Sequence, residues 1–397
     1  MKIIQLEAQG FRSLKRVTWK PGDLNVVIGP NGTGKSNLLR LLELISISAQ
    51  GHLGRYIQSA GGMEPLVWDG QWAGINLRLK TTPLKPKANA RENLTYELNL
   101  HRLGKSSAYR IEHELLGNFF NFDAGLKKQP LKLLERNGTE AKVFNEKQRG
   151  FSAPAESILE EETLLSIAAG PFTYNRLIPP YQDELSSWCV YHDFHVDQQA
   201  VIRQPAVARL EKRVSPDGQN LTNVIHTLYT SDRDFKHEIN AAMRAAFGQD
   251  FDELIFPPAA DQRIQLRLRW KSLKREQSAA DLSDGTLRFL FLLTVLASPE
   301  SAPLIAIDEP ETGLHPAMLP IVAEYAVEAS RKSQVIFTTH SPQFLDSFKD
   351  YVPTTTVASW ENGETSLLTK TGEELTQWLS DYSLGELFNS GDLEAMG

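Results

Sequence analysis

The stretch GPNGTGKSN, residues 29–37, constrains the fold of this chain more than any other part of the sequence. It fits the pattern G-x-x-x-x-G-K-[ST] of a phosphate-binding loop. The fixed positions of that pattern are Gly29, Gly34, Lys35 and Ser36. Residues 24–29 form an apolar run of strand length, and residues 36–47 carry apolar side chains at helical spacing. The chain is therefore expected to form a strand, a loop and a helix in succession, as part of an α/β sheet.

Each residue type in this loop has a physical role. Glycines let backbone N–H groups turn inward around phosphate oxygens, and the helix N-terminus adds a partial positive charge. We expect Lys35 to reach the β- and γ-phosphates and the Ser36 hydroxyl to ligate Mg²⁺. The residues expected to contact the nucleotide are Asn31, Gly32, Thr33, Gly34, Lys35, Ser36 and Asn37.

A second group of motifs lies far downstream. In APLIAIDEPETGLHP (302–316), an apolar strand ends in Asp308, which is suited to hold the metal, and Glu309, which is suited to polarise the attacking water. Upstream, Ser283 and Gly285 begin a long apolar helix, and downstream the strand SQVIFTTHS ends in His340. Singly, these features also fit a solvated strand end, a helix cap and a structural histidine. Their order and short spacing (308 − 283 = 25; 340 − 308 = 32) favour one site.

Composition narrows the class of protein. A net charge of −7 argues against binding nucleic acid by bulk charge, and one cysteine, Cys189, excludes a disulfide framework. The longest apolar run, residues 287–297, is too short to span a bilayer. The N-terminus does not have the pattern of a signal peptide. We therefore expect a cytoplasmic protein with no membrane partner.

The middle of the chain carries two kinds of periodicity. Alternation with period two predicts antiparallel strands over 74–80, 94–103 and 108–116. Helical spacing predicts helices over 155–169 and 234–248, and LIPPYQDE (177–184) is interpreted as a break between helices. Sustained heptads are absent, so long coiled-coil arms are not expected.

Three further segments contain residue types that could bind a metal ion or a phosphate backbone. In WCVYHDFHVD (188–197), strand alternation points His192 and His195 apart, so a structural strand is favoured over a metal site. Residues 80–91 are interpreted as a cationic loop. Residues 263–275 alternate basic and apolar side chains; a solvated face is favoured, with contact to a phosphate backbone as the alternative.

Taken together, the motifs resemble those of ABC-type ATPases, in particular the RecF/SMC-like branch of predicted AAA-family ATPases. The similarity covers nearly the whole chain. It rests on GFRSLK (10–15) before the phosphate-binding loop, LSDGT (282–286) as a signature motif, IDEPETGLHP (307–316) as Walker B with D-loop, and TTHSPQFLD (338–346) with a switch histidine. Residues 217–228 and 378–388 are less specific matches.

The resemblance implies an α/β fold, that of a P-loop NTPase of ABC type, with a mixed-sheet N-terminal lobe and an inserted helical lobe. It divides the chain into an N-terminal ATPase lobe (1–150), a helical lobe (151–250) and a C-terminal ATPase lobe (251–397). It also implies the cofactors ATP and Mg²⁺ and a homodimer in which each signature motif caps the partner's nucleotide. Lys35, Ser36, Asp308, Glu309 and His340 then act in cis, Ser283 and Gly285 in trans, and Arg12 contacts phosphate. Lys35, Glu309 and His340 are the expected catalytic residues, and Ser36 and Asp308 the metal ligands.

One element of the family pattern is not identified by spacing. ABC ATPases have a loop glutamine that senses the γ-phosphate and metal, and the candidates here are Gln50, Gln58 and Gln71. WDGQW (68–72) is mildly preferred.

Two functional classes remain open. In the first, ATP-dependent dimerisation controls DNA engagement or a partner effector such as a nuclease, as in DNA repair or anti-phage defence. In the second, a regulatory NTPase acts only on a protein partner; a transporter ATPase subunit is disfavoured. Only 57 residues follow His340 (397 − 340), so a nuclease domain like that of related overcoming-lysogenisation proteins is expected on a separate chain.

Overall fold

A computed structural model describes most of the chain. The described residues are 1–84, 93–104, 108–118, 131–154, 157–170, 173–192, 194–259, 262–348, 351–375, 379 and 382–395. Most of the cationic segment predicted at 80–91 therefore lies outside the described residues. Within the described ranges, no helix combines the length and apolar character needed to cross a bilayer.

The chain folds into two compact units. Unit 1 comprises Met1–Gly22, Val27–Trp188 and Thr354–Lys370, and unit 2 comprises Asp23–Val26, Cys189–Pro353 and Thr371–Gly397. Each unit thus combines segments that are distant in the sequence. The division into 1–150, 151–250 and 251–397 stays a prediction.

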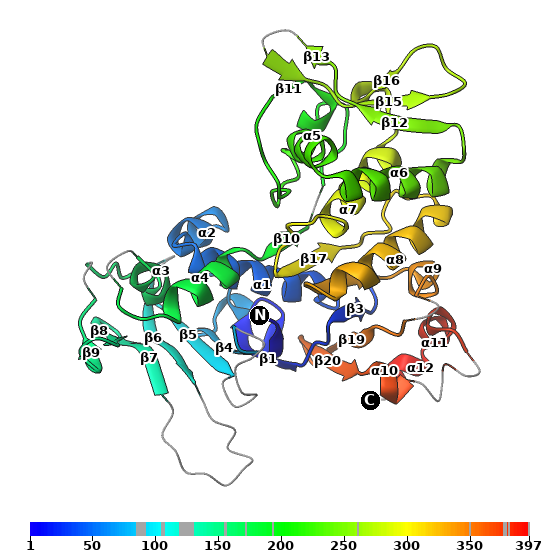
Figure 1. The fold of residues 1–397 in the computed structure, drawn as a ribbon. Coiled ribbons are helices and arrows are strands. Elements are labelled where there is room, and N and C mark those ends of the chain that lie inside the picture. The colour runs from blue at the N-terminus through cyan, green and yellow to red at the C-terminus, as the bar shows by residue number, and fades with distance from the viewer. Residues whose placement is uncertain are drawn as a thin grey trace. The chain divides into compact units, whose positions relative to one another are not determined.

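Unit 1 contains an eight-stranded antiparallel sheet with the order β2-β1-β4-β5-β6-β7-β8-β9 (Figure 1). Its strands are β1 (Ile3–Phe11), β2 (Leu14–Trp19), β4 (Gly74–Thr81), β5 (Leu94–Arg102), β6 (Tyr109–Asn118), β7 (Leu131–Asn137), β8 (Glu140–Asn145) and β9 (Gly150–Ser152). Tyr96 lies opposite Leu79 in β4 and Leu116 in β6. All three are buried, so one face of these strands forms core. The three strands predicted from period-two alternation are confirmed.

The helices of unit 1 are α1 (Lys35–Ala49), α2 (Leu53–Ser59), the 3₁₀ turn η1 (Trp68–Gly70), α3 (Leu164–Ala168) and α4 (Ile178–Ser186). Helix α1 contacts α2, α3 and α4. Two local predictions are wrong. Among the described residues of 155–169, only Leu164–Ala168 are helical, starting where the Thr163 hydroxyl accepts the Ser166 N–H. LIPP starts helix α4 and does not separate helices, because the first turn needs no proline N–H.

Unit 2 contains parallel strands. β10 (Cys189–Tyr191), β17 (Leu304–Asp308), β18 (Gln334–Thr339) and the first residues of β3 (Leu24–Ile28) are neighbours in this order. Val190 lies opposite Ala306, and Asp308 opposite Thr338. Nearly every side chain in β17 and β18 is buried, as expected of parallel strands covered on both faces. The end of β3 belongs to unit 1, where its sheet neighbours are β19 (Thr354–Glu361) and then β20 (Glu364–Lys370).

Unit 2 also contains helices along the described part of the chain. They are α5 (Leu221–Ser231), α6 (Arg233–Phe247), α7 (Asp284–Leu296), α8 (Leu319–Ser330), α9 (Pro342–Leu345), α10 (Gly372–Leu375), α11 (Leu384–Ser390) and α12 (Asp392–Ala395), with 3₁₀ turns η3 (Val201–Arg203), η5 (Ala279–Asp281) and η6 (Pro316–Met318). α6 packs against α5, α7 and α8. The helix predicted at 234–248 is confirmed as α6.

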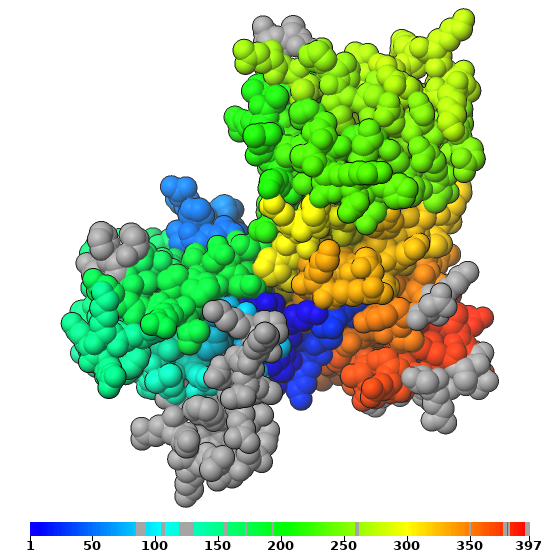
Figure 2. Space-filling model, viewed as in Figure 1, coloured from blue at the N-terminus to red at the C-terminus, as the bar shows by residue number. Residues whose placement is uncertain are grey.

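Two small sheets complete unit 2. They contain β11 (Ala206–Val207), β12 (Phe251–Ile255), β13 (Pro258–Ala259), β14 (Arg263–Ile264), β15 (Arg267–Trp270) and β16 (Gln277–Ser278). The segment from α5 to β16, green to yellow-green in Figure 2, forms one continuous packed body. The basic stretch 263–275 is not a single strand: β14 and β15 are separate and belong to different sheets.

Candidate functional site

The phosphate-binding loop in unit 1 is shaped by its glycines. Gly34 has φ +96° and precedes the first residue of α1. A Cβ at Gly34 would lie 2.1 Å from Thr365 Oγ1 and 2.5 Å from Ser13 Oγ, which no real Cβ tolerates. A Cβ at Gly29 would lie 2.2 Å from the Ala358 carbonyl oxygen. Only glycine therefore fits at these two positions of the motif.

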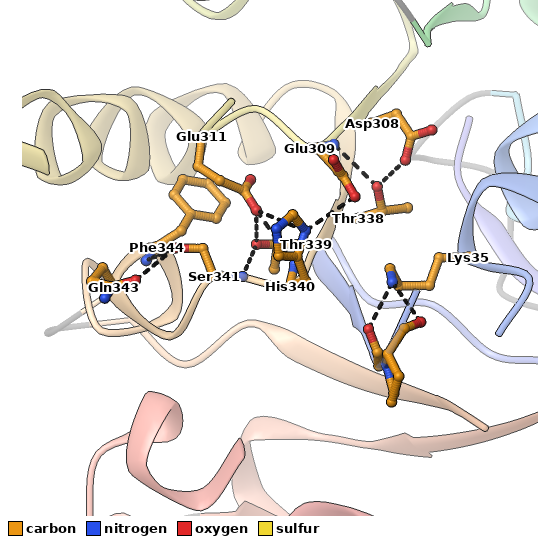
Figure 3. A network of polar contacts seen from close by, with 12 residues as sticks. Lys35, Asp308, Glu309, Glu311, Thr338, Thr339, His340, Ser341, Gln343 and Phe344 are labelled. Atoms are coloured by element: carbon orange, nitrogen blue, oxygen red, sulfur yellow. Dashed lines mark hydrogen bonds and ion pairs between the residues drawn. The ribbon is translucent and has the colours of Figure 1, made fainter. Parts of the chain in front are cut away.

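Lys35 lies in the first turn of α1 and is buried. Its Nζ donates to the carbonyl oxygens of Gly29, at 2.7 Å, and Pro30, at 3.0 Å (Figure 3). The ammonium is thus held over the loop that precedes its own helix. This is the position from which the motif's lysine is expected to reach phosphate oxygens.

The tip of the β1–β2 hairpin braces the loop from outside. Asn37 Nδ2 donates to Ser13 Oγ at 2.7 Å. Thr365 Oγ1, from β20, lies 2.7 Å from Ser13 Oγ and 2.8 Å from the Thr33 carbonyl oxygen. Three segments that are remote in the sequence therefore meet at the loop within unit 1. Ser13 lies within GFRSLK, but no role was predicted for it from the sequence. No role was predicted for Thr365 either.

Arg12 occupies the same hairpin tip, with φ +47°. Its backbone N–H donates to the Leu66 carbonyl at 2.8 Å, and its Nε is buried without a hydrogen-bond partner. Burial, followed by the nearby Arg40 charge, lowers the pKa of the Arg12 guanidinium. Contact between Arg12 and phosphate stays a prediction.

The three glutamines considered for the sensing loop differ in their surroundings. The Gln50 amide donates to the Ser186 carbonyl at 2.8 Å, which ties it to the end of α4. Gln58 in α2 and Gln71 after η1 are exposed. These contacts do not single out one residue for the role.

The acidic residues predicted from the second group of motifs lie in unit 2, where β17 ends. Asp308 accepts a hydrogen bond from the Thr338 hydroxyl of the adjacent strand β18. On the other neighbouring strand, His192 directly follows β10 and places its Nδ1 3.8 Å from Asp308 Oδ2. His192 was interpreted as part of a structural strand, but β10 ends at Tyr191. No local pattern in the sequence indicates that this strand ends beside Asp308.

Glu309 has an unusual backbone conformation, with φ +47°. Non-glycine residues rarely adopt positive φ, and such strain occurs often at functional sites. The Glu309 N–H lies 3.1 Å from the Thr338 carbonyl oxygen and 3.2 Å from its hydroxyl. Glu309 Oε1 lies 3.1 Å from His340 Nδ1, so the acid and the histidine predicted from separate motifs are in contact.

Glu311 is a further acidic residue that the sequence analysis did not single out. Its side chain is 9% exposed, against 37% for Glu309. Glu311 Oε1 accepts the Thr339 hydroxyl at 2.5 Å and the His340 N–H at 3.3 Å. Burial raises the pKa of the Glu311 carboxyl. Figure 3 shows Glu309 and Glu311 both pointing toward His340. Only its place within IDEPE could have drawn attention to it.

The signature motif lies at the start of α7, also in unit 2. Ser283 is the N-cap: its Oγ accepts the Thr286 N–H at 3.2 Å. A Cβ on Gly285 would lie 2.5 Å from the Gly313 carbonyl oxygen. Gly285 therefore lets the loop that follows Glu309 pack directly on the signature helix, in addition to any role toward phosphate.

The two arginines of β15, within the basic stretch 263–275, form ion pairs. Arg269 lies 2.8 Å from a Glu253 oxygen and 3.1 Å from a Glu276 oxygen. Arg267 lies 3.6 Å from Glu276. These pairs offset part of the positive charge of the stretch, and its interpretation as a solvated face stays a prediction.

Residues 24–346 match the family model described as "AAA domain, putative AbiEii toxin, Type IV TA system". That match spans 323 residues (346 − 24 + 1) and includes the phosphate-binding loop, the signature motif, the strand-end acids and His340. The chain belongs to this family. It is an ABC-type ATPase of the RecF/SMC-like branch, as its motifs predicted.

Three further proteins are similar to this chain at lower identity. The chain is 21% identical over 352 residues to an "OLD nuclease" of Thermus scotoductus, a match that covers 86% of this chain and 59% of the relative's length. An SMC head bound to the C-winged helix domain of ScpA superimposes with a TM-score of 0.56 at 14% identity, covering 95% of this chain and all of that one. A Pyrococcus furiosus SMC head superimposes with a TM-score of 0.54 at 13% identity, covering 96% of this chain and 98% of that one. The expected fold class, a P-loop NTPase of ABC type, is confirmed.

The side chains fit the cofactors that this family uses. The Ser36 hydroxyl in unit 1 and the Asp308 carboxylate in unit 2 are each an oxygen donor of the hard kind that Mg²⁺ prefers. The glycine-shaped loop followed by a helix N-terminus matches the charge of a triphosphate. Within the His–Asp–His segment 192–195, residue 193 lies outside the described residues.

Proposed function

We propose that the chain hydrolyses ATP to ADP and phosphate, with Mg²⁺ as cofactor, in an ATP-dependent homodimer. The observation that carries this proposal is the setting of Glu309. Its strained backbone, the bonds of its N–H to Thr338 and its contact with His340 orient one carboxylate directly after the Asp308 strand. A fixed carboxylate next to a metal ligand is what positioning an attacking water requires.

The roles of the residues follow from their chemistry. Lys35 and the N–H groups at the start of α1 bind the phosphates, and Ser36 and Asp308 hold the metal. Glu309 orients the water and accepts its proton, while His340 holds Glu309 in place through their 3.1 Å contact. Bound Mg²⁺ neutralises charge that develops on the phosphate oxygens.

The proposed dimer places Ser283 and Gly285 of one copy on the nucleotide held by the other. Ser283 lies at the N-terminus of a 13-residue helix, where backbone N–H groups and the helix dipole favour a negative group. A monomer would then bind ATP but hydrolyse it slowly, because half of the charge-stabilising groups come from its partner.

We propose that this dimerisation controls DNA engagement or a partner effector such as a nuclease in the cytoplasm, in DNA repair or anti-phage defence. The support is the similarity to a protein named OLD nuclease and to a family whose description includes a toxin–antitoxin system. Because the chain spans 59% of the nuclease's length, that similarity does not assign a nuclease activity to this chain.

The ion pairs of Arg267 and Arg269 favour a second candidate, a regulatory ATPase that acts only on a protein partner. ATP turnover measured with and without duplex DNA at two salt concentrations separates the two functions. Stimulation that weakens with salt supports DNA engagement, because phosphate contacts release counterions. No stimulation and no salt-sensitive binding supports the protein-only function.

The ATPase proposal is tested with two variants. Glu309→Gln is expected to bind ATP and accumulate as a dimer, since it keeps the side-chain shape but cannot take the proton. Lys35→Ala is expected to lose nucleotide binding and remain monomeric. Size-exclusion chromatography with light scattering at saturating Mg-ATP measures both outcomes. Glu324→Gln, on an exposed position of α8, is the matched control and should behave as wild type. A Glu309→Gln protein that stays monomeric would contradict the dimer.

A further inference from the structure

Arg203, the last residue of η3, is a buried arginine that none of the motifs includes. It is 7% exposed, and its guanidinium contacts six acceptors within unit 2. Those acceptors are the carbonyl oxygens of Val196 (2.8 Å), Asp197 (3.0 Å), Ala279 (3.1 Å), Ala280 (3.3 Å) and Leu282 (2.7 Å), and the carboxylate of Asp284. Because all three guanidinium nitrogens have acceptors, the Arg203 side chain is held in a fixed position.

The acceptors fall into two groups. Nε donates to the carbonyl oxygens of Val196 and Asp197, in the segment after β10. The two terminal nitrogens donate to carbonyl and carboxylate oxygens in the stretch 279–284, which overlaps the signature motif. Because the guanidinium is planar and its donors have fixed directions, these contacts fix the backbone on both sides of it.

Ser283 lies between two of these contacts, the Leu282 carbonyl and the Asp284 carboxylate. The backbone that leads into α7 is extended at Leu282 and Ser283, with ψ 149° and 153°. The Leu282 N–H donates to the Ala279 carbonyl at 3.4 Å, and the Ser283 carbonyl accepts the Leu287 N–H at 3.2 Å. Between these bonds, Arg203 supplies the donor for the Leu282 carbonyl, at 2.7 Å. Without it, buried carbonyls would lose their partner, which is costly in a desolvated site.

We propose that Arg203 is a positioning residue for the signature motif, which it holds in the conformation that engages the nucleotide on the partner protomer. The inference rests on the proposed homodimer. Arg203 does not touch the nucleotide in this arrangement; it acts through Ser283 and the first turn of α7. A defect at Arg203 therefore damages the site that contains the partner's phosphate-binding loop and leaves the variant's own loop intact.

The test is turnover by mixed dimers. Arg203→Gln alone is expected to bind Mg-ATPγS with the wild-type dissociation constant by calorimetry, while its kcat falls by about 100-fold, as for a misplaced catalytic group. Lys35→Ala alone is inactive. An equal mixture of the two is expected to regain turnover that neither variant shows alone, because each mixed dimer has one complete site, formed by the phosphate-binding loop of the Arg203→Gln copy and the signature motif of the Lys35→Ala copy. Exposed Arg331→Ala is the matched control and should keep wild-type kcat.

A second mixture separates this inference from the dimer itself. Ser283→Arg mixed with Lys35→Ala should recover in the same way if the site is shared between two copies. Recovery of that pair without recovery of the Arg203 pair would overturn the role of Arg203. No recovery by either pair would contradict the dimer. If Arg203→Gln does not fold, as judged by circular dichroism, Asp284→Ala takes its place in the mixture with the same expected outcomes.

Discussion

The phosphate-binding loop and the cluster of strand-end acids are built in different ways. In unit 1, nine consecutive residues form the phosphate-binding loop, and its shape depends on glycines that leave no room for a Cβ. In unit 2, Asp308, Glu309, His340 and their contacts come from the ends of three parallel strands and from one loop. The shape of the phosphate-binding loop depends mainly on backbone sterics. The arrangement of the strand-end acids depends mainly on polar contacts between side chains.

This difference predicts different responses to substitution. A change in the loop of unit 1 should affect folding and nucleotide binding together, because the same close packing produces both. A change among the strand ends of unit 2 should affect turnover more than stability, because Glu309 and His340 are partly exposed. Three predictions test the contrast, beginning with the largest expected effect.

Gly34→Ala should lower the free energy of unfolding by about 3 kcal/mol, from positive-φ strain plus the clash with Thr365 and Ser13. Gly32→Ala is the matched control. Gly32 also has a positive φ, +84°, but a Cβ there meets nothing within 4 Å, so its cost is about 1 kcal/mol. Urea denaturation followed by tryptophan fluorescence measures both. Equal losses would show that close packing does not shape the loop.

His340→Ala should reduce kcat by about 100-fold, the usual size of an acid–base or orienting contribution, with little change in unfolding temperature. The reason is that Glu309 loses the contact that orients its carboxylate. Steady-state turnover and calorimetric nucleotide binding separate the effect on kcat from an effect on affinity. His237→Ala, on an exposed position of α6, should leave both unchanged. Loss of nucleotide affinity in His340→Ala would contradict an orienting role.

Glu311→Gln should have the smallest effect, and it should depend on pH. Burial raises the pKa of the Glu311 carboxyl in the folded protein above its usual range, so its ionisation opposes folding. The wild type therefore loses stability as pH rises through the raised pKa, and glutamine, which can accept the same Thr339 and His340 bonds, does not. The melting temperature of Glu311→Gln relative to wild type should increase between pH 4 and pH 7. A difference that is constant with pH would exclude a raised pKa.

Prediction from the sequence succeeded where the signal is local. Period-two alternation identified β4, β5 and β6, and helical spacing identified α6, since these patterns reflect one buried face. It failed at α4, where two prolines resemble a break but suit the first turn of a helix. At β15, the sequence pattern identified the two arginines. It did not show that they pair with Glu253 of β12 and with Glu276 between β15 and β16.

The sequence by itself determined the identity of the phosphate-binding loop, the strand-end acids and the family, because each of these depends on residue types at fixed spacing. The tertiary structure alone decided that Ser13 and Thr365 brace the loop, that His192 and Thr338 adjoin Asp308, and that Arg203 holds the signature motif. The physical reason is that strand order and long-range hydrogen bonds bring together residues up to 352 positions apart, and no local pattern records such pairings.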